Sequence, residues 1–481
     1  MSRFYQPWPT RVASPPRGLA RNVSQLALRV VAVAAPILRR FPGIVFMTAL
    51  AALSLLAWWI ARLSQNALQT DGAGGAIWPL QFSLVRDVLG LTGVLVFVSV
   101  LAMFAIWWER KVAGFIQSRL GPMRVGGWHG WSQSLADGIK LLSKEDLVPA
   151  QADRALFRLA PYLSFVPALC AYVALPFGVS WVFRQIDVAL LLVLAMLSLE
   201  ILGILLAGWA SGNKWSMLGA MRQTVQVVSY EVPMGIALLV PVMVAGTLAL
   251  SGPDGITARQ AGGWMHWFAF HSPWTFAAML IYFVASLAAC KRAPFDLPEA
   301  ESELVGGFHT EYSGFRWSLF FFAEYSAMFV ASGLLVLLFL GGWDAPWAGL
   351  APTPGAGPLA GLAHALFFSS PLWFIVKCML LIYVQMWLRW TLPRVRIDQV
   401  LHACLKFLLP LSIVTLIAAA AWELAAERSP LFANVASAFR ILLAVGGMLF
   451  CGAVLAVIVG GRRLAQRLVG TMAVPAPLRG A

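Results

Sequence analysis

The feature that most limits what this chain can fold into is a series of apolar stretches, each about 20 residues long. Lipid offers no partners for backbone N–H and C=O groups, so a stretch of this length crosses a bilayer as a helix, which satisfies those groups internally. Hydrophobic residues make up 60% of the chain and charged residues only 12%, against about 25% in a soluble domain. We therefore predict an all-α fold, a polytopic transmembrane helix bundle of about ten spans. The predicted spans lie near residues 44–61, 88–108, 158–178, 186–208, 232–251, 273–290, 317–340, 371–390, 406–424 and 437–460.

Basic residues alternate between the loops of this predicted bundle. The loops after the second, fourth, sixth, eighth and tenth spans carry most of them, including Lys291, Arg292 and Arg389. Because basic loops stay on the cytoplasmic side, both termini are predicted to be cytoplasmic. The net charge of +14 is spread through these loops, with no basic stripe or base-reading motif that would indicate nucleic-acid binding.

Residues 1–43 contain seven arginines and no acidic residue. Transit peptides have a similar composition. A basic cytoplasmic tail is the simpler interpretation, since the apolar stretch that follows, 44–61, is too long and too far from the start for a signal peptide.

The loop after the second span contains a helical pattern. Trp131, Leu135, Ile139 and Leu142 fall on one face, with polar residues elsewhere, and Pro149 ends the segment. A soluble helix that faces a core would show the same period. The flanking spans favour an amphipathic helix that lies at the membrane interface.

Acidic residues gather between two predicted spans, in residues 292–325. This stretch holds six of the 21 acidic residues of the chain, namely Asp296, Glu299, Glu301, Glu303, Glu311 and Glu324. A charge at the bilayer centre costs roughly 2.5–3.5 kcal/mol, so such groups usually line a wet cavity, form ion pairs or carry protons. A solvated loop is the alternative, but Glu324 lies about two helical turns inside the following span.

Other ionisable residues lie at the cytoplasmic ends of spans or inside them. They are Glu109, Arg110, Lys111, Arg119, Glu145, Asp146, Glu200, Glu231 and Asp398. Arginines and buried acids on one side of a membrane suit a site that binds a polar headgroup on an apolar tail and passes protons inward. For any single residue, ion pairing that fixes a helix end is the alternative. His309 is either a proton relay or a hydrogen-bonding loop residue.

Motifs for cofactors are absent from the sequence. The five cysteines stand singly, and no histidines have metal-ligand spacing. There is also no phosphate-binding loop and no dinucleotide fingerprint. We therefore expect no nucleotide, flavin, iron–sulfur or metal site within this chain.

Several longer motifs resemble a known family. They are Glu-Arg-Lys at 109–111, Arg-Leu-Gly-Pro-Met-Arg-Val-Gly at 119–126, Leu-Ala-Asp-Gly-Ile-Lys-Leu-Leu at 135–142, Lys-Glu-Asp at 144–146, Gly-Trp-Ala-Ser-Gly-Asn-Lys at 208–214, Ser-Tyr-Glu-Val at 229–232, the stretch 292–324, and Leu-Pro-Arg-Val-Arg-Ile-Asp-Gln at 392–399. In this order they resemble the H subunit of bacterial NADH:quinone oxidoreductase, respiratory complex I, and its mitochondrial counterpart, subunit 1 of NADH dehydrogenase. The resemblance runs from about residue 86 to 425.

The resemblance implies four segments: a basic tail (1–43), an extra first span with its loop (44–85), an eight-span family domain (86–425) and an extra last span with a basic tail (426–481). It also implies a quinone tunnel and an acidic path that couples quinone reduction to proton pumping. The tunnel residues would be Glu109, Arg110, Arg119 and Asp137. The acidic path would contain Glu231, Glu299, Glu301, Glu303, Glu311, Glu324 and Asp398.

By the same resemblance, quinone is the substrate, and FMN and the iron–sulfur clusters belong to partner subunits. The partners would be the hydrophilic quinone-site and terminal iron–sulfur subunits, small membrane subunits and antiporter-like subunits, in a bacterial cell inner membrane. The chain departs from the family at 288–292, where Ala-Ala-Cys-Lys-Arg replaces Ala-Glu-Thr-Asn-Arg and the usual glutamate is absent. Glu200, at a position that is commonly small or apolar in the family, is a candidate compensating acid.

Other functions remain open at this point. One is the equivalent subunit of a ferredoxin- or hydrogenase-linked complex, although the full acidic stretch argues against it. Another is a self-contained proton-coupled transporter, which would need discontinuous spans in paired halves. Pro233 and Pro241 are the only hint of such a break. A membrane anchor would leave the placement of so many acids without a use.

Overall fold

The computed structural model describes residues 83–126, 129–178, 181–299, 301–350 and 368–471, all within the unit Ala61–Ala481. In these ranges the chain is helical, and the extended pairings are isolated bridges between Gly178 and Trp181 and between Asp344 and Ser369. The prediction of an all-α fold is confirmed.

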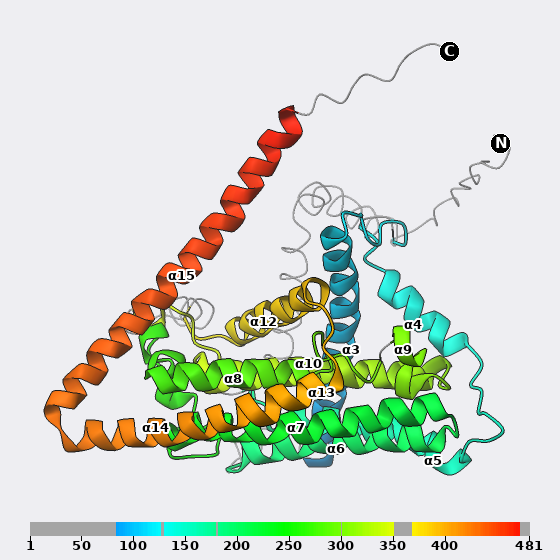
Figure 1. Cartoon of the computed structure of the whole chain (residues 1–481), viewed down its shortest axis with the longest axis horizontal. Coiled ribbons are helices and arrows are strands. Elements are labelled where there is room, and N and C mark those ends of the chain that lie inside the picture. The colour runs from blue at the N-terminus through cyan, green and yellow to red at the C-terminus, as the bar shows by residue number, and fades with distance from the viewer. Residues whose placement is uncertain (1–82, 127–128, 179–180, 300, 351–367, 472–481) are drawn as a thin grey trace, which may run out of the picture. The chain divides into compact units, whose positions relative to one another are not determined.

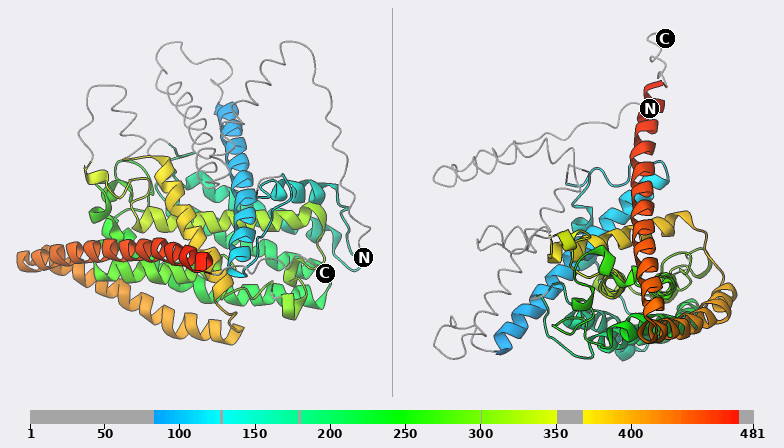
Figure 2. Two further views of the ribbon diagram at one scale, coloured as in Figure 1. Left: turned by 90° about the horizontal axis from the view of Figure 1, so that it is seen from above. Right: turned by 90° about the vertical axis from the view of Figure 1, so that its left-hand side faces the viewer.

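Helices of more than ten residues make up most of this structure (Figure 1). They are α3 (Ser83–Ile116), α4 (Gln133–Ser143), α5 (Arg154–Ala174), α6 (Ala189–Ala210), α7 (Lys214–Ala245), α8 (Pro273–Ala289), α10 (Gly314–Phe339), α12 (Pro371–Thr391), α14 (Leu409–Arg428) and α15 (Pro430–Thr471). The shorter elements are η1 (Ala258–Gln260), η2 (Trp264–His266), η3 (Phe268–Phe270), α9 (Glu301–Leu304), η4 (Gly307–His309), η5 (Ala348–Leu350), α13 (Ile397–Leu401) and η6 (His402–Leu408). Helices α6, α7 and α8 pack side by side, and α3 crosses them steeply (Figures 1 and 2).

Nine of the ten predicted spans coincide with helices. Among the described residues, eight helical runs are long and apolar enough to cross a membrane, and α8, with 17 residues, is apolar but shorter. The chain is therefore a multi-pass membrane protein. The first predicted span, 44–61, lies outside the described residues, as do the basic tail 1–43 and the loop up to residue 82.

Helix α7 begins well before the span that hydropathy predicts at 232–251. Asn213 caps it by accepting a hydrogen bond from the backbone N–H of Trp215 at 3.0 Å. The first turns of α7 pack against α9 and η4 on one side. Hydropathy registers lipid contact, so it misses a helical segment that lies against polar loop elements.

The same helix continues through Pro233 and Pro241 without interruption. A proline inside a helix removes one backbone hydrogen bond and often kinks the helix, but neighbouring helices can hold it in place. The break that a self-contained transporter would need is therefore absent at these two positions.

Helix α10 occupies the centre of the bundle. Of its apolar window, 89% is buried within the protein, and it contacts α3, α5, α8 and α12. The hydroxyl of Tyr172 on α5 donates to the carbonyl of Ser326 at 3.2 Å, and that of Tyr282 on α8 donates to Ala331 at 2.9 Å. Because these bonds come from two sides, they fix the rotation of α10 and hence the direction of Glu324.

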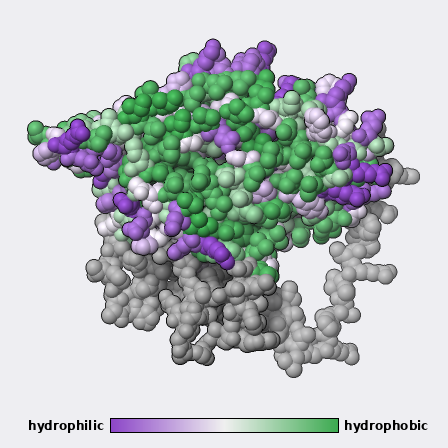
Figure 3. All heavy atoms as spheres, turned by 90° about the horizontal axis from the view of Figure 1, so that it is seen from below, coloured by the Kyte–Doolittle hydropathy of each residue, from purple (hydrophilic) through white to green (hydrophobic). Residues whose placement is uncertain are grey.

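The outer surface of the bundle is largely apolar. In Figure 3, hydrophobic residues cover most of the described face and hydrophilic residues gather along its edges. On α4, Leu135, Ile139 and Leu142 are 49%, 60% and 67% exposed, and Trp131 just before it is 58% exposed. A helix that faces a core would bury these side chains, so their exposure favours the membrane interface.

Candidate functional site

Arg292 is fully buried in the turn that ends α8. The turn forms because Lys291 adopts a left-handed backbone conformation, with φ of +53°, and the N–H of Arg292 bonds to the carbonyl of Leu287 at 3.1 Å. An arginine remains charged inside a protein, so it needs anionic partners there.

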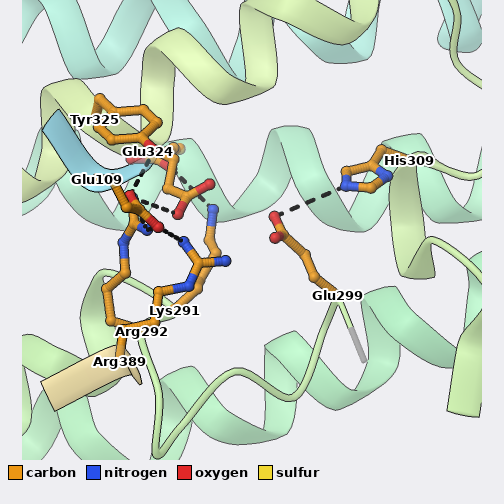
Figure 4. Close-up of polar contacts among 9 residues, drawn as sticks. Glu109, Lys291, Arg292, Glu299, His309, Glu324, Tyr325 and Arg389 are labelled. Carbon is orange, nitrogen blue, oxygen red and sulfur yellow. Dashed lines mark hydrogen bonds and ion pairs between the residues drawn. The ribbon is translucent and has the colours of Figure 1, made fainter. Parts of the chain in front are cut away.

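Two carboxylates from different helices surround this guanidinium (Figure 4). Nη1 of Arg292 donates to both oxygens of Glu109 on α3, at 3.1 and 2.9 Å, and Nη2 lies 3.0 Å from Oε1 of Glu324 on α10. Burial alone would lower the pKa of Arg292, but the two carboxylates raise it well above its usual value. Arg292 therefore ties α3 to α10 as a permanent cation.

Glu109 has two further donors. The hydroxyl of Tyr325 donates to its Oε2 at 2.7 Å, and Nη1 of Arg389 on α12 donates to its Oε1 at 2.6 Å. Two carboxylates and two guanidinium groups thus meet, so their formal charges cancel. We call Glu109, Arg292, Glu324, Tyr325 and Arg389 the Arg292 network. Removing one partner from a buried ion pair typically costs about 3–5 kcal/mol, so the network is stable only as a unit.

Glu200 lies beside this network in an ion pair of its own. Its Oε1 is 3.2 Å from Nζ of Lys291, and the two side chains are 6% and 5% exposed. Glu231 on α7 accepts a hydrogen bond from the hydroxyl of Ser198 on α6. These two predicted acids are therefore held on facing helices, outside the network itself.

Glu299 lies in the loop after α8, where His309 faces it at 3.9 Å between Oε1 and Nε2 (Figure 4). Burial raises the pKa of Glu299, and the carboxylates of Glu324 and Asp296 raise it further. Burial lowers the pKa of His309 to about 4. Near neutral pH the carboxyl therefore tends to keep its proton while the imidazole is uncharged, so both side chains of this contact are neutral.

Three of the four predicted tunnel residues lie at the surface of this chain. Arg110 follows Glu109 on α3 but is exposed, and its Nη1 lies 2.6 Å from Oδ2 of Asp137 on α4. Arg119 is also exposed and donates from Nε to Oε1 of Gln117 at 2.7 Å. Only Glu109, among these four, is buried in the network.

The remaining predicted acids lie near the surface. Glu303 is half-exposed and pairs with Arg222 at 2.6 Å. Glu311 accepts a hydrogen bond at 2.6 Å from the side chain that caps α7, and Asp398 is exposed in the first turn of α13. Glu301 begins α9, but its side chain lies outside the described part of the structure. Glu303, Glu311 and Asp398 do not join the Arg292 network.

Three members of the network are not among the residues that the sequence singles out. By sequence, Arg292 and Arg389 belong to basic loops, whereas the structure buries the first completely and most of the second. Tyr325 looks like one aromatic residue among many in an apolar span. The available signal was position, because Arg292 directly follows an apolar helix and precedes the acidic stretch.

Metal ligands do not cluster in the part of the chain that the structure describes, where no three His, Cys, Asp or Glu side chains could hold an ion. The described side chains instead supply buried carboxyl, guanidinium, phenol and imidazole groups. Groups of this kind exchange protons and respond to changes in one another's charge.

Comparison with known proteins gives a consistent result. A family model described as NADH dehydrogenase matches residues 89–420. The H subunit of NADH-quinone oxidoreductase from Anaeromyxobacter dehalogenans is 43% identical over 375 residues, which cover 77% of this chain and 88% of that protein. The proteins of the same name from Chlorobaculum parvum and Geobacillus thermodenitrificans are 46% and 45% identical, over 68% and 65% of this chain and 90% and 87% of their own length.

The Arg292 network lies entirely within the matched residues 89–420, and so do Glu200, Glu231 and Glu299. Helix α15 follows the matched region. The match covers more than half of the chain, and the relatives align over most of their own length. The chain therefore belongs to the family of the NADH-quinone oxidoreductase H subunit, a membrane subunit of respiratory complex I.

Proposed function

We propose that this chain forms the quinone access tunnel, and the acidic path that couples quinone reduction to proton pumping, in a proton-translocating NADH:quinone oxidoreductase. The names of its relatives support membership of that complex. The observation that carries the rest is the Arg292 network, which keeps four charged side chains inside a membrane bundle. Charges in that position are costly and usually serve transport or proton relay.

The tunnel side of the proposal rests on α3. Arg110 is exposed, while its neighbour Glu109 points into the bundle. Quinone reduction takes up two electrons and two protons, so negative charge develops on the headgroup before protons arrive. Arg110, with Asp137 and Arg119, would orient that headgroup at the surface of the chain. Glu109, the neighbour of Arg110 that points into the bundle, would respond to the change in charge on the headgroup.

The path side of the proposal follows the contacts of Arg292. This guanidinium lies between Glu109 and Glu324, at 2.9 and 3.0 Å. If Glu109 takes up a proton, Arg292 loses one of its two counter-charges and keeps only Glu324 as an anionic partner. A charged Glu324 in turn contributes to the raised pKa of Glu299. A protonation event at one end of the network would thus change how tightly a proton is held at the other.

The remaining acids extend this path. Glu200 and Glu231 would continue it between α6 and α7. Glu301, Glu303, Glu311 and Asp398 would exchange protons with water or with partner subunits. The partners would be the hydrophilic quinone-site and iron–sulfur subunits, together with small membrane and antiporter-like subunits, and FMN and the clusters would lie in partner subunits. The complex would lie in a bacterial cell inner membrane, with both termini of this chain cytoplasmic.

The test is Glu324→Gln in the assembled complex, in inverted membrane vesicles. The substitution removes one counter-charge of Arg292 without changing the size of the side chain. Quinone reduction by NADH and proton uptake should both fall by about tenfold or more, equivalent to a rise in the barrier of roughly 1.4 kcal/mol. Glu427→Gln, at an exposed position near the end of α14, is the matched control and should leave both rates unchanged. Unchanged rates of quinone reduction and proton uptake in assembled Glu324→Gln complexes would overturn the proposal.

A further inference from the structure

A small cavity with several polar groups in a mainly apolar lining lies between α6, α7, α8 and α10. Its volume is about 30 Å³, and its polar lining comes from Ser198, Glu200, Tyr230, Glu231 and Lys291. A water molecule needs roughly 10–15 Å³ of such volume and several polar partners, so this cavity has room for one or two. Water there would connect the carboxylate of Glu231 on α7 with that of Glu200 on α6.

Lys291 closes this cavity on the side of the acidic stretch. Its ammonium pairs with Glu200 at 3.2 Å, although the backbone of Lys291 adopts a left-handed conformation that is strained for a residue with a side chain. The residue also lies directly before Arg292 and so is anchored next to the Arg292 network. The backbone of Lys291 is thereby held in place, and the ammonium at the end of its long side chain forms the ion pair.

A second carboxyl group, that of Glu299, lies close enough to Lys291 for their charges to interact. In Figure 4, Glu299 extends towards the ammonium of Lys291, with His309 beyond it. Burial raises the pKa of Glu299, as do Glu324 and Asp296, while the positive charge of Lys291 acts in the opposite sense. Lys291 therefore stands between one acid with which it is paired and another whose ionisation it would favour.

We propose that Lys291 is a movable counter-cation, whose ammonium pairs with Glu200 while that carboxylate is ionised and turns to Glu299 when Glu200 is protonated. This inference rests on the proposed function, because it adds a step to the same acidic path. It also assigns a role to the ion pair between Lys291 and Glu200, which lies outside the Arg292 network.

The step is balanced in protons and in charge. A proton reaches Glu200 from cavity water, an O–H bond forms there, and the ammonium of Lys291 loses its partner. As the ammonium turns to Glu299, the O–H bond of that carboxyl breaks, and its proton passes to water. One proton enters at Glu200 and one leaves at Glu299, while Lys291 stays protonated throughout.

The test uses the whole complex in inverted vesicles, with Glu200→Gln and Lys291→Gln combined. The double substitution removes both charges of the ion pair, so it avoids the buried charge without a partner that a single substitution would leave. The control combines Glu423→Gln with Arg440→Gln, which removes the carboxylate and the guanidinium that contact His271 at 2.9 and 2.8 Å, outside the cavity. We expect the Glu200/Lys291 variant, and not the control, to lose most of its proton pumping per quinone reduced.

A second readout follows the proton on Glu299. Its protonated carboxyl band in infrared spectra, identified by its loss in Glu299→Gln, should persist to higher pH once the ammonium is gone. If both the pumping ratio and this titration match the control, Lys291 and Glu200 form a static ion pair and the proposal is overturned. Glu324→Gln, measured in parallel, tests the proposed function separately: if it lowers both rates while the double variant matches its control, only the counter-cation is wrong.

If the double variant does not assemble, the variant Lys291→Arg provides a second test of the proposal. Arginine keeps a permanent charge of similar reach. Because the ammonium never gives up its proton in the proposed step, this variant should still couple quinone reduction to pumping. An assembled Lys291→Arg complex that reduces quinone without pumping would overturn the proposal.

Discussion

At the scale of single residues, Glu299 and His309 differ from the other predicted acids and bases outside the spans. Each lies in a protein environment that disfavours its charged form, so near neutral pH both tend to be uncharged at 3.9 Å from one another. Glu303 shows the contrast, because its hydrogen bond with Arg222 lowers the pKa of its carboxyl and keeps it ionised. The buried pair therefore favours the neutral forms of its two groups, and the surface pair the charged forms.

The depressed pKa of His309 predicts a specific loss of stability in acid. The unfolded chain protonates this imidazole below about pH 6.5 and the folded chain only below about pH 4, so stability falls as pH drops through that window. The full loss from this residue is roughly 3 kcal/mol. His309→Asn should remove that part of the acid sensitivity, as measured by the thermal inactivation rate of the purified complex between pH 6.5 and 5.

The matched control for this prediction is His266→Asn, in η2, where the histidine is exposed. It should keep the acid sensitivity of the unmodified complex. If His309→Asn instead inactivates as steeply with falling pH as the unmodified complex does, protonation of the buried imidazole does not cause the acid sensitivity of the complex.

The acids of the site could be predicted from the sequence more easily than their partners. Acidic residues are scarce in this chain, so Glu324 inside an apolar span and the cluster before it attract notice. The arginines of the site attract less notice in the sequence, because loops on the cytoplasmic side are usually basic whether or not they have a function. Moreover, Glu109 lies 183 residues from Arg292 and 280 from Arg389, and no local pattern indicates which distant side chains meet.

At the scale of helices, the sequence predicts which segments form helices but not how those helices pack against one another. Nine predicted spans coincide with helices because length and hydropathy suffice to identify them. Which glycines allow two helices to touch depends on tertiary contacts alone. At Gly203 on α6, an added Cβ would come within 2.4 Å of the backbone nitrogen of Ser164 on α5, whereas at Gly235 on α7 it would meet nothing within 4 Å.

This difference predicts opposite effects of one substitution at the two glycines. Gly203→Ala should force α5 and α6 apart and destabilise the protein by about 1–3 kcal/mol, the usual cost of overpacking. Gly235→Ala should be neutral or stabilise by roughly 0.5–1 kcal/mol, because alanine favours the helix. The measurement is the unfolding temperature of the purified complex, together with its yield. Equal effects at both positions would show that the α5–α6 contact is not close-packed.

At the scale of the whole molecule, the described chain has a part that matches the family and a helix that lies beyond the match. The region that matches the family, 89–420, contains the Arg292 network and the cavity. Helix α15 follows it and is held by a histidine bridge, in which Nη2 of Arg440 lies 2.8 Å from Nδ1 of His271 and Nε2 faces Glu423 at 2.9 Å. Since arginine can only donate, Nδ1 must accept, and the ring proton points to Glu423.

This arrangement predicts that α15 can be removed without loss of the chemistry. Only 6% of its apolar window is buried within the chain, and its principal contacts are α14, η2 and η3, none of which contributes a side chain to the Arg292 network. A chain that ends at Arg428 should therefore assemble, reduce quinone and pump protons at the unmodified rates. The measurement is the same pair of rates in inverted vesicles, with Arg440→Gln as the control that loosens the bridge and keeps the helix. If the shortened chain fails to assemble while Arg440→Gln assembles normally, α15 supplies a contact that the complex requires, and the working unit extends beyond the family region.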